Sequence, residues 1–334
     1  GLVGSEMCIR DRPQDIPEAV TGFHPGGFFD LEKSGALLLA AEGSGQVREV
    51  QFNDKPIPPK ISQEIRAPNA RYIASVNWPF WGDVLAISQF SLDQMLMIRG
   101  YKPLHPEEQF EIATVPLSPN PPSVRNAERL TVGDLDGDGI HEILFASPIT
   151  KEIMVLRFPG KEGFPKAEPL MQSDDWGMPL RVYIEDLDGD GHMDLTLVDS
   201  AGFGKIHLLK NDGQGKFSEA GTIDFPLEKF GKAIWQLSYG WDRDGAHIAY
   251  VTGAGGQVLF HLDPTDPFHD WKPRVLASST YDPSFDQILS DLNGDGWLDI
   301  VVARTASVNN LMVMFGPLNS AFDEIAAKGV VLSD

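Results

Sequence analysis

Three acidic stretches recur along the chain at a constant spacing. They read DLDGDGIHE from Asp134, DLDGDGHMD from Asp186 and DLNGDGWLD from Asp291, so their first aspartates lie 52 and 105 residues apart. Because the larger gap is about two periods, a further copy is expected between them, and YGWDRDGAHIAYV keeps two of the acids, Asp242 and Asp244. Self-similarity at a fixed period of this size is the signature of a repeat architecture.

Two earlier units keep the strand pattern but not the full acidic loop. NWPFWGDVLAISQF has lost the carboxylates. FFDLEKSGALLLAAE is a degenerate copy that keeps Asp30, Glu32 and Gly35. The period therefore predicts a single domain over residues 21–334 made of six units, with approximate bounds 21–66, 67–117, 125–174, 177–227, 231–278 and 281–334.

Each unit has the same internal order of short apolar segments. An apolar segment precedes the acidic loop, a second such as EILFAS follows it, and two more follow across Gly- and Asn-rich turns such as NDGQGKF. Four short antiparallel strands per unit, repeated radially, are typical of a β-propeller. We therefore expect an all-β propeller of six four-stranded blades, with a seventh possible if the chain is truncated. A solenoid is the alternative, but its repeats are usually shorter.

Composition limits the classes of partner. The net charge is −21, which argues against nucleic acid and anionic membranes as partners and favours cations or neutral ligands. The sequence has no apolar run of about 18 residues, the length of a membrane-spanning helix. We expect a monomer without direct membrane insertion.

The first twelve residues differ in character from the repeats that follow. GLVGSEMCIRDR, residues 1–12, resembles a translated sequencing adapter of the kind found in metagenomic assemblies, and residues 13–20 would then be a linker or remnant. Cys8, the single cysteine, lies in that stretch, so no disulfide or thiol chemistry is expected. A signal peptide is expected to have been lost by truncation.

The crowded carboxylates predict a bound cation. Two carboxylates about 5 Å apart repel by about 3 kcal/mol at an effective dielectric of about 20. Hard oxygen ligands in a flexible loop suit calcium, which takes six to eight oxygens. We expect about three Ca²⁺ ions, held by acidic or amide side chains and one backbone carbonyl (Ile140, His192 or Trp297) in each loop: Asp134, Asp136, Asp138, Ile140 and Glu142; Asp186, Asp188, Asp190, His192 and Asp194; Asp291, Asn293, Asp295, Trp297 and Asp299.

Other interpretations of the loops fit less well. An EF-hand needs a glutamate at position twelve and flanking helices, whereas here the acid stands at position nine and a strand pattern follows. Magnesium tolerates irregular ligation poorly. A solvated turn without metal is the remaining alternative, and three copies at one period argue against it. In the fifth unit Gly240 replaces the first acid, so we expect no calcium there, nor in the first two units.

The motif resembles a known family. DxDxDGxxD followed by an apolar strand, and then a hairpin such as HLLKNDGQGKF, is similar to the FG-GAP/VCBS repeats of integrin-α-type β-propellers. The resemblance covers nearly all of residues 21–334. It implies calcium in the loop that joins the first two strands of a blade, and often seven blades.

A ligand face is expected over the central channel, where propellers commonly bind ligands through the loops that enter the inner strands. Aromatic and arginine side chains there could bind a sugar or a peptide, although each could equally be a packing or ion-pairing residue. The candidates are His24, Arg71, Trp78, Arg125, Arg129, Trp176, Arg181, Trp235 and Tyr281.

Three functions remain open. The first is a calcium-stabilised adhesion or binding module that recognises a glycan or protein. The second is a propeller enzyme such as a polysaccharide lyase or glycosidase, although no catalytic set stands out beyond the metal loops. The third is a scaffold domain of a larger secreted protein. Hairpin loops bind calcium weakly, and millimolar calcium is found outside the cytosol. An extracellular, cell-surface or periplasmic location is therefore expected.

Overall fold

A computed structural model gives the arrangement of most of the chain. It describes residues 22–25, 36–41, 45–51, 60–89, 94–99, 111–117, 129–200, 204–225, 234–253, 256–277, 284–291, 294–304, 311–314, 316 and 330–331. The expected adapter and linker, residues 1–20, and the worn acidic positions Asp30, Glu32 and Gly35 lie outside these residues.

The described strands form six four-stranded sheets, here called sheets 1 to 6 in chain order, and every pairing is antiparallel between neighbours in sequence. Sheets 1 to 3 consist of β1 (Gly22–Pro25), β2 (Ala36–Ala41), β3 (Gln46–Gln51) and β4 (Lys60–Arg66); β5 (Ala70–Trp78), β6 (Gly82–Gln89), β7 (Gln94–Arg99) and β8 (Glu111–Pro116); and β9 (Thr131–Gly133), β10 (Glu142–Ser147), β11 (Glu152–Leu156) and β12 (Ala167–Gln172).

The second half of the chain repeats this plan. Sheets 4 to 6 consist of β13 (Pro179–Glu185), β14 (Asp194–Asp199), β15 (Lys205–Asn211) and β16 (Phe217–Asp224); β17 (Ile234–Trp241), β18 (His247–Gly253), β19 (Gly256–Leu262) and β20 (Trp271–Ala277); and β21 (Ser284–Ser290), β22 (Asp299–Arg304), β23 (Leu311–Met314) and β24 (Val330–Val331).

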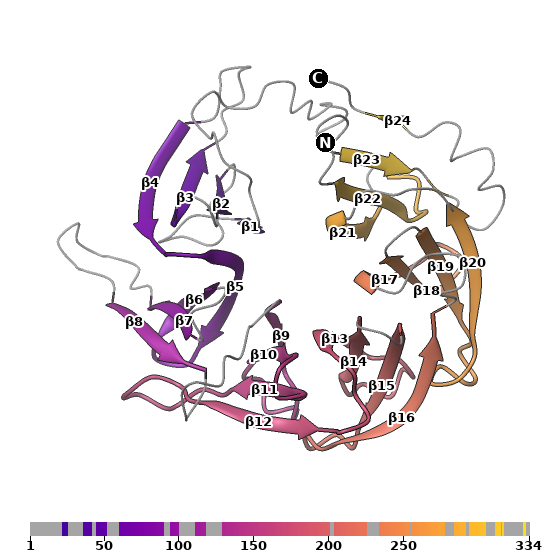
Figure 1. Ribbon diagram of the computed structural model, residues 1–334, viewed down its shortest axis with the longest axis horizontal. Helices are drawn as coiled ribbons and strands as arrows, with labels where there is room; N and C mark the ends of the chain where they lie inside the picture. Colours follow the sequence, from indigo (N-terminus) through magenta and orange to yellow (C-terminus); the bar gives the residue numbers. More distant parts are fainter. Residues whose placement is uncertain are drawn as a thin grey trace.

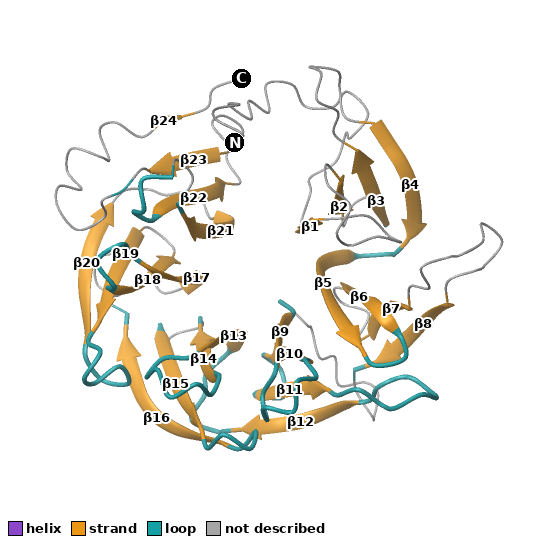
Figure 2. Ribbon diagram, turned by 180° about the vertical axis from the view of Figure 1, so that it is seen from behind, coloured by secondary structure: helices purple, strands orange, loops and turns teal. Residues whose placement is uncertain are grey.

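The sheets stand around a central axis as blades. Figure 1 shows the first strand of each sheet at the inside of the ring and the last strand at its rim. Figure 2 shows strands and loops, with no helix among the described residues. That part of the chain therefore offers no helix long and apolar enough to cross a membrane. The prediction of an all-β propeller built of four-stranded antiparallel sheets is confirmed.

The core is divided among the boundaries between successive sheets. Five clusters of buried apolar side chains are described, and each draws its residues from two neighbouring sheets. Phe145 of sheet 3, for example, packs in one cluster with Trp78 of sheet 2, whereas Leu144 of sheet 3 packs in another with Trp176, which lies between β12 and β13, and with Leu195 of sheet 4. In the described part of the chain, the buried apolar side chains thus form a series of interfaces between successive sheets.

Strand periodicity explains this division. Successive side chains of a strand point to opposite faces of the sheet, so Ile143 and Phe145 face sheet 2 while Leu144 and Ala146 face sheet 4. Because both faces are covered, all six residues of β10 are buried. The second strands of sheets 4 and 5 are buried throughout in the same way, which explains their continuous apolar sequences.

We expect Phe145→Ala to destabilise the protein strongly, because Phe145 is 0% exposed and its loss leaves a cavity between sheets 2 and 3. Losses of this kind cost about 3–5 kcal/mol. The matched control is Ile149→Ala, whose side chain is 56% exposed in the β10–β11 turn. Urea denaturation of both variants checks the assignment, and similar unfolding midpoints for the two would contradict it.

Candidate metal centres in the loops after the inner strands

The three acidic loops occupy the same place in their sheets. Loop 1 (134–141) joins β9 to β10, loop 2 (186–193) joins β13 to β14, and loop 3 (291–298) joins β21 to β22. Each therefore links the innermost strand to the second strand. The glycines of loops 1 and 2 have φ between 72° and 85°, a left-handed backbone that glycine adopts without steric cost.

The first aspartate of each loop organises the backbone of that loop. The two carboxylate oxygens of Asp134 accept hydrogen bonds from the N–H groups of Gly137 and Gly139, at 2.8 and 2.9 Å. In loop 2 Asp186 makes the equivalent bonds, at 2.8 and 3.0 Å, and in loop 3 Asp291 makes them at 2.7 and 2.8 Å. The recurrence shows that one local geometry is used three times.

The ninth-position acid begins the second strand and is buried. Glu142 is 3% exposed, and Asp194 and Asp299 are 0% exposed. The Glu142 carboxylate accepts the N–H of Leu135 at 3.0 Å, and Asp194 accepts the N–H of Leu187 at 3.2 Å. In loops 1 and 2 the buried acid therefore fixes the backbone of the second loop residue, Leu135 or Leu187, by a hydrogen bond.

Burial makes these carboxylates costly to ionise. It raises the pKa of Glu142 to about 6, against the opposing effect of the Leu135 N–H and of Arg157. It also raises the pKa of Asp194 to about 6, although two backbone N–H groups lower it. A buried negative charge at neutral pH is stabilised by a nearby cation, so both sites favour one.

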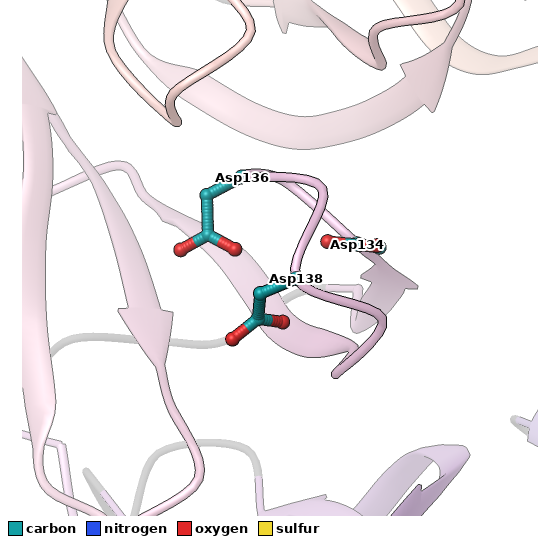
Figure 3. Close-up of side chains that lie close together, drawn as sticks. All are labelled: Asp134, Asp136 and Asp138. Atoms are coloured by element: carbon teal, nitrogen blue, oxygen red, sulfur yellow. The ribbon is translucent and has the colours of Figure 1, made fainter.

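Loops 1 and 2 each bring three carboxylates together. In loop 1 they belong to Asp134, Asp136 and Asp138, and in loop 2 to Asp186, Asp188 and Asp194; within each set, one oxygen of each lies within 4.8 Å of the others. Figure 3 shows the carboxylates of Asp136 and Asp138 on the same side of loop 1. Oxygens about 2.3–2.6 Å from one ion are separated by at most about 5 Å, so these sets are compatible with a metal ion.

One orphaned atom supports the fit of loop 1 to a cation. The Oδ1 atom of Asp136 is buried and has no hydrogen-bond partner. A buried oxygen without a partner is unfavourable unless another group binds it. The donor set and this atom together fit a hard cation held by oxygen ligands.

Two basic side chains reach the same loops from the end of the third strand, and the sequence analysis did not assign them. Arg157 lies 3.4 Å from Asp136 Oδ2 and 3.3 Å from Glu142 Oε1. Lys210 pairs with Asp188 and lies 3.2 Å from Asp190 Oδ2. The hydrogen bond to Asp188 raises the pKa of Lys210. The signal was present in the repeat, since EIMVLR and KIHLLK align with the basic residue last.

Loop 3 is described only in part, because Asn293 lies outside the described residues. Trp297 N–H donates to Asp295 Oδ1 at 2.8 Å, and Gly316 N–H donates to the buried Asp299 at 2.8 Å. The metal ligation expected of loop 3, and of the carbonyls of Ile140, His192 and Trp297, stays a prediction.

The fifth unit uses its acid differently. Its loop is shorter, and His247 begins β18 where an acid begins the second strand in sheets 3, 4 and 6. Asp242, which is 5% exposed, accepts the N–H groups of Arg243 at 3.0 Å and of Leu298 at 3.2 Å. Asp242 thereby ties its loop to loop 3 of the next sheet.

The proposed ligand-face tryptophans are largely packing residues. Trp78 is 1% exposed and Trp176 is 0% exposed, each in a core between two sheets. The indole N–H of Trp78 donates to the carbonyl of His141 in loop 1 at 2.8 Å. Both side chains are therefore packing residues in this structure, and the expectation that they contact a ligand stays a prediction.

Other predicted ligand-face residues meet at the inner strands. Arg181 donates to the carbonyl of Trp235 and, at 3.2 Å, to the hydroxyl of Tyr72. Arg129 donates to Gln236 Oε1 at 2.9 Å and lies over the ring of Tyr183. We call this group the channel cluster: Tyr72, Arg129, Arg181, Tyr183, Trp235 and Gln236.

Three of the remaining candidates lie wholly or partly outside the described residues. Arg71 is half-buried in β5. His24 belongs to β1, but its side chain is outside the described residues, as are Arg125 and Tyr281 entirely.

A cavity of about 420 Å³ lies between loops 1 and 2, on the loop face of the ring rather than in the channel cluster. Its polar lining includes His141, Glu185 and His192, and its apolar lining includes Val132, Ile184 and Met193. Both histidines are exposed. The Nε2 atom of the buried His247 lies 3.2 Å from Glu185 Oε1 beside this wall. The cavity could not be predicted from the sequence, because its walls belong to two different repeats.

Comparison with known proteins supports the repeat assignment. Residues 134–197 match the FG-GAP-like repeat family, and they contain loops 1 and 2. Comparison with curated proteins gives no match.

Solved structures share the fold. The chain is similar to a protein from Lactobacillus plantarum, with TM-score 0.60, 13% identity and coverage of 90% of this chain and 81% of that one. It is similar to a putative 6-phosphogluconolactonase from Bacteroides fragilis, with TM-score 0.58, 12% identity and coverage of 88% and 79%. It is also similar to a periplasmic gluconolactonase from Pseudomonas aeruginosa, with TM-score 0.56, 15% identity and coverage of 88% of this chain and 80% of that one. At such identities the likeness concerns the fold alone, and the chain is a β-propeller that carries an FG-GAP-like repeat at residues 134–197.

Proposed function

We propose that this protein is a calcium-stabilised binding module of an extracellular, cell-surface or periplasmic protein. The observation that carries the proposal is the pair of carboxylate sets in loops 1 and 2, each with oxygens within 4.8 Å of one another. Calcium accepts six to eight oxygen ligands in irregular geometry, which suits aspartates in a hairpin loop. In this proposal the ion would neutralise the loop and hold the turn between the first two strands.

The residues assigned to the ions are those of the sequence analysis. Asp136 and Asp188 would bind through side chains that now pair with Arg157 and Lys210, and Glu142 and Asp194 would contribute buried oxygens. The basic side chains reduce the repulsion within each loop when no ion is bound. Their presence also lowers the calcium affinity, which agrees with a compartment where calcium is plentiful.

For the ligand, the cavity between loops 1 and 2 is a better candidate than the channel cluster. Arg129 and Arg181 already donate to protein atoms, whereas the cavity is lined by the exposed residues His141 and His192 together with apolar residues such as Val132 and Ile184. Polar groups that converge over an apolar surface suit a sugar unit or a short peptide segment. We therefore place glycan or protein recognition on the loop face.

An enzyme is the second candidate, and the same cavity is the observation that favours it. Its lining includes two histidines and Glu185 beside residues of loop 1. Two of the similar structures also carry gluconolactonase names. Incubation with sugar lactones and with acidic polysaccharides separates this candidate from a binding module. Release of acid or of unsaturated ends that is lost in His141→Ala would favour the enzyme.

We expect calcium to raise the melting temperature of the protein, with a stoichiometry of about three. An ion that binds only the folded chain adds about 2.7 kcal/mol at 100 times its Kd. Asp188→Ala should lower the stoichiometry by about one, whereas Glu168→Ala, on the exposed face of β12, should not change it. Calorimetric titration measures both, and a melting curve unaffected by a chelator would contradict the proposal.

We expect calcium affinity to fall as the pH falls through 6. Burial raises the pKa of Glu142 and Asp194 to about 6, so below that pH each acid binds a proton that calcium must displace. The apparent Kd at loops 1 and 2 should rise about fourfold between pH 7.5 and 5.5. Titration calorimetry at the two pH values tests this. In Glu142→Gln the dependence should persist at loop 2 alone, and equal affinities at both pH values for the parent protein would refute it.

We expect the double variant His141→Ala, His192→Ala to lose binding to any glycan that a glycan array identifies. Both imidazoles line the cavity, so their removal takes away hydrogen-bonding groups at its rim. The control is His269→Ala, whose side chain is 63% exposed in the connection between β19 and β20, far along the chain from the cavity. Equal binding by the parent protein and the double variant would move the ligand site elsewhere.

A further inference from the structure

The amide of Asn211 touches two acidic loops at once. Its Nδ2 atom donates to the carbonyl of Leu135 in loop 1 at 2.8 Å and to the carbonyl of Met193 in loop 2 at 2.9 Å. Asn211 is 2% exposed, so water does not compete for these bonds. We propose that Asn211 is a positioning residue that couples ion binding in loop 1 to ion binding in loop 2 across the boundary of sheets 3 and 4. This inference rests on the proposed calcium binding.

The turn that follows Asn211 is built on the same side chain. Its Oδ1 atom accepts the N–H groups of Gly213 at 3.0 Å and Gly215 at 3.2 Å. The turn also packs against both loops: a Cβ at Gly215 would lie 3.2 Å from Asp136 Cβ, and one at Gly213 would lie 2.7 Å from His192 Nε2. The amide is therefore held in one orientation, with both donors directed at the loops.

Asn211 is also linked to the buried acids of both loops, to one through its side chain and to the other through its backbone. Leu135, whose carbonyl accepts from Asn211, donates its own N–H to Glu142 at 3.0 Å. On the other side, the N–H of Asn211 donates to Asp194 Oδ1 at 2.9 Å. An ion bound in loop 1 would fix the carbonyl of Leu135, and an ion bound in loop 2 would fix that of Met193. Either carbonyl then holds the side-chain amide of Asn211 in place. Part of the ordering cost of the second loop is then already met, so the two ions bind cooperatively.

The coupling should be confined to loops 1 and 2. The cross-strand pairs define equivalent positions in the third strands. Leu209 pairs with Leu195 in sheet 4, Leu156 with Ile143 in sheet 3, and Met314 with Ile300 in sheet 6. Two residues later the chain has Asn211 in sheet 4, but Phe158 in sheet 3, Asp263 in sheet 5 and Gly316 in sheet 6. The backbone bond to the ninth acid recurs at Gly316, but no amide accompanies it. Loop 3 thus serves as an internal control.

The test is a coupling cycle measured by calcium titration calorimetry on the whole protein. Loop 2 is disabled with Asp188→Asn and Asp190→Asn, and loop 1 with Asp136→Asn and Asp138→Asn. In the parent protein, an active loop 2 should raise the affinity of loop 1 about fivefold, and loop 1 should raise that of loop 2 by the same factor. In the Asn211→Ala background both ratios should fall to about one, with loop 3 unaffected.

Two further variants keep the test decisive. Asn211→Asp preserves the acceptors for Gly213 and Gly215 but removes the donors, so it should lose the coupling even if Asn211→Ala does not fold. Gln287→Ala removes another buried amide, which donates to Tyr250 O at 2.8 Å and accepts from Thr252 at 2.7 Å. It should destabilise the protein and keep the coupling.

The outcomes separate this inference from the function on which it rests. A parent protein that binds no calcium overturns both. A parent that fills its loops with independent affinities, or an Asn211→Asp variant that retains the full coupling, overturns the role of Asn211 and leaves the calcium module standing.

Discussion

The structure depends on sheets that are apolar on both faces. The second strands of sheets 3, 4 and 5 are buried along their whole length, so each of these sheets needs a neighbour on either side. Sheets that twist and stack in this way arrange themselves around an axis, and five cores between sheets are described as a result. The acidic loops stand where this packing ends, at the turn from the inner strand to the second strand.

Packing and charge oppose each other at that turn. Glu142 and Asp194 are the first residues of β10 and β14 and are buried there. This burial raises the pKa of each to about 6. The first aspartate of each loop, Asp134 or Asp186, is held beside these acids by the glycine N–H groups of its own loop. Arg157 and Lys210 offset part of the repulsion. A cation would offset the rest, so the charge of the loops depends on the same strand pairing that builds the fold.

The repeats are not independent units. Loop 1 receives a hydrogen bond from Trp78 of the preceding sheet and another from Asn211 of the following sheet. Asp242 shows the same tendency, because a residue that keeps the acidic pattern binds the backbone of the next loop. Repeats that diverge in sequence can thus exchange a candidate metal ligand for a contact between sheets.

The sequence by itself determined the period, the four-stranded unit and the position of the acids within each loop. Those features are local: alternation decides the buried faces, and Asp–Gly spacing decides the turn. Only the tertiary structure decided that Trp78 and Trp176 are core residues, that Arg181 reaches Tyr72 across 109 residues and that Asn211 reaches Leu135 across 76. The physical reason is that such contacts depend on the rotation and distance between neighbouring sheets, and the period of a repeat specifies neither.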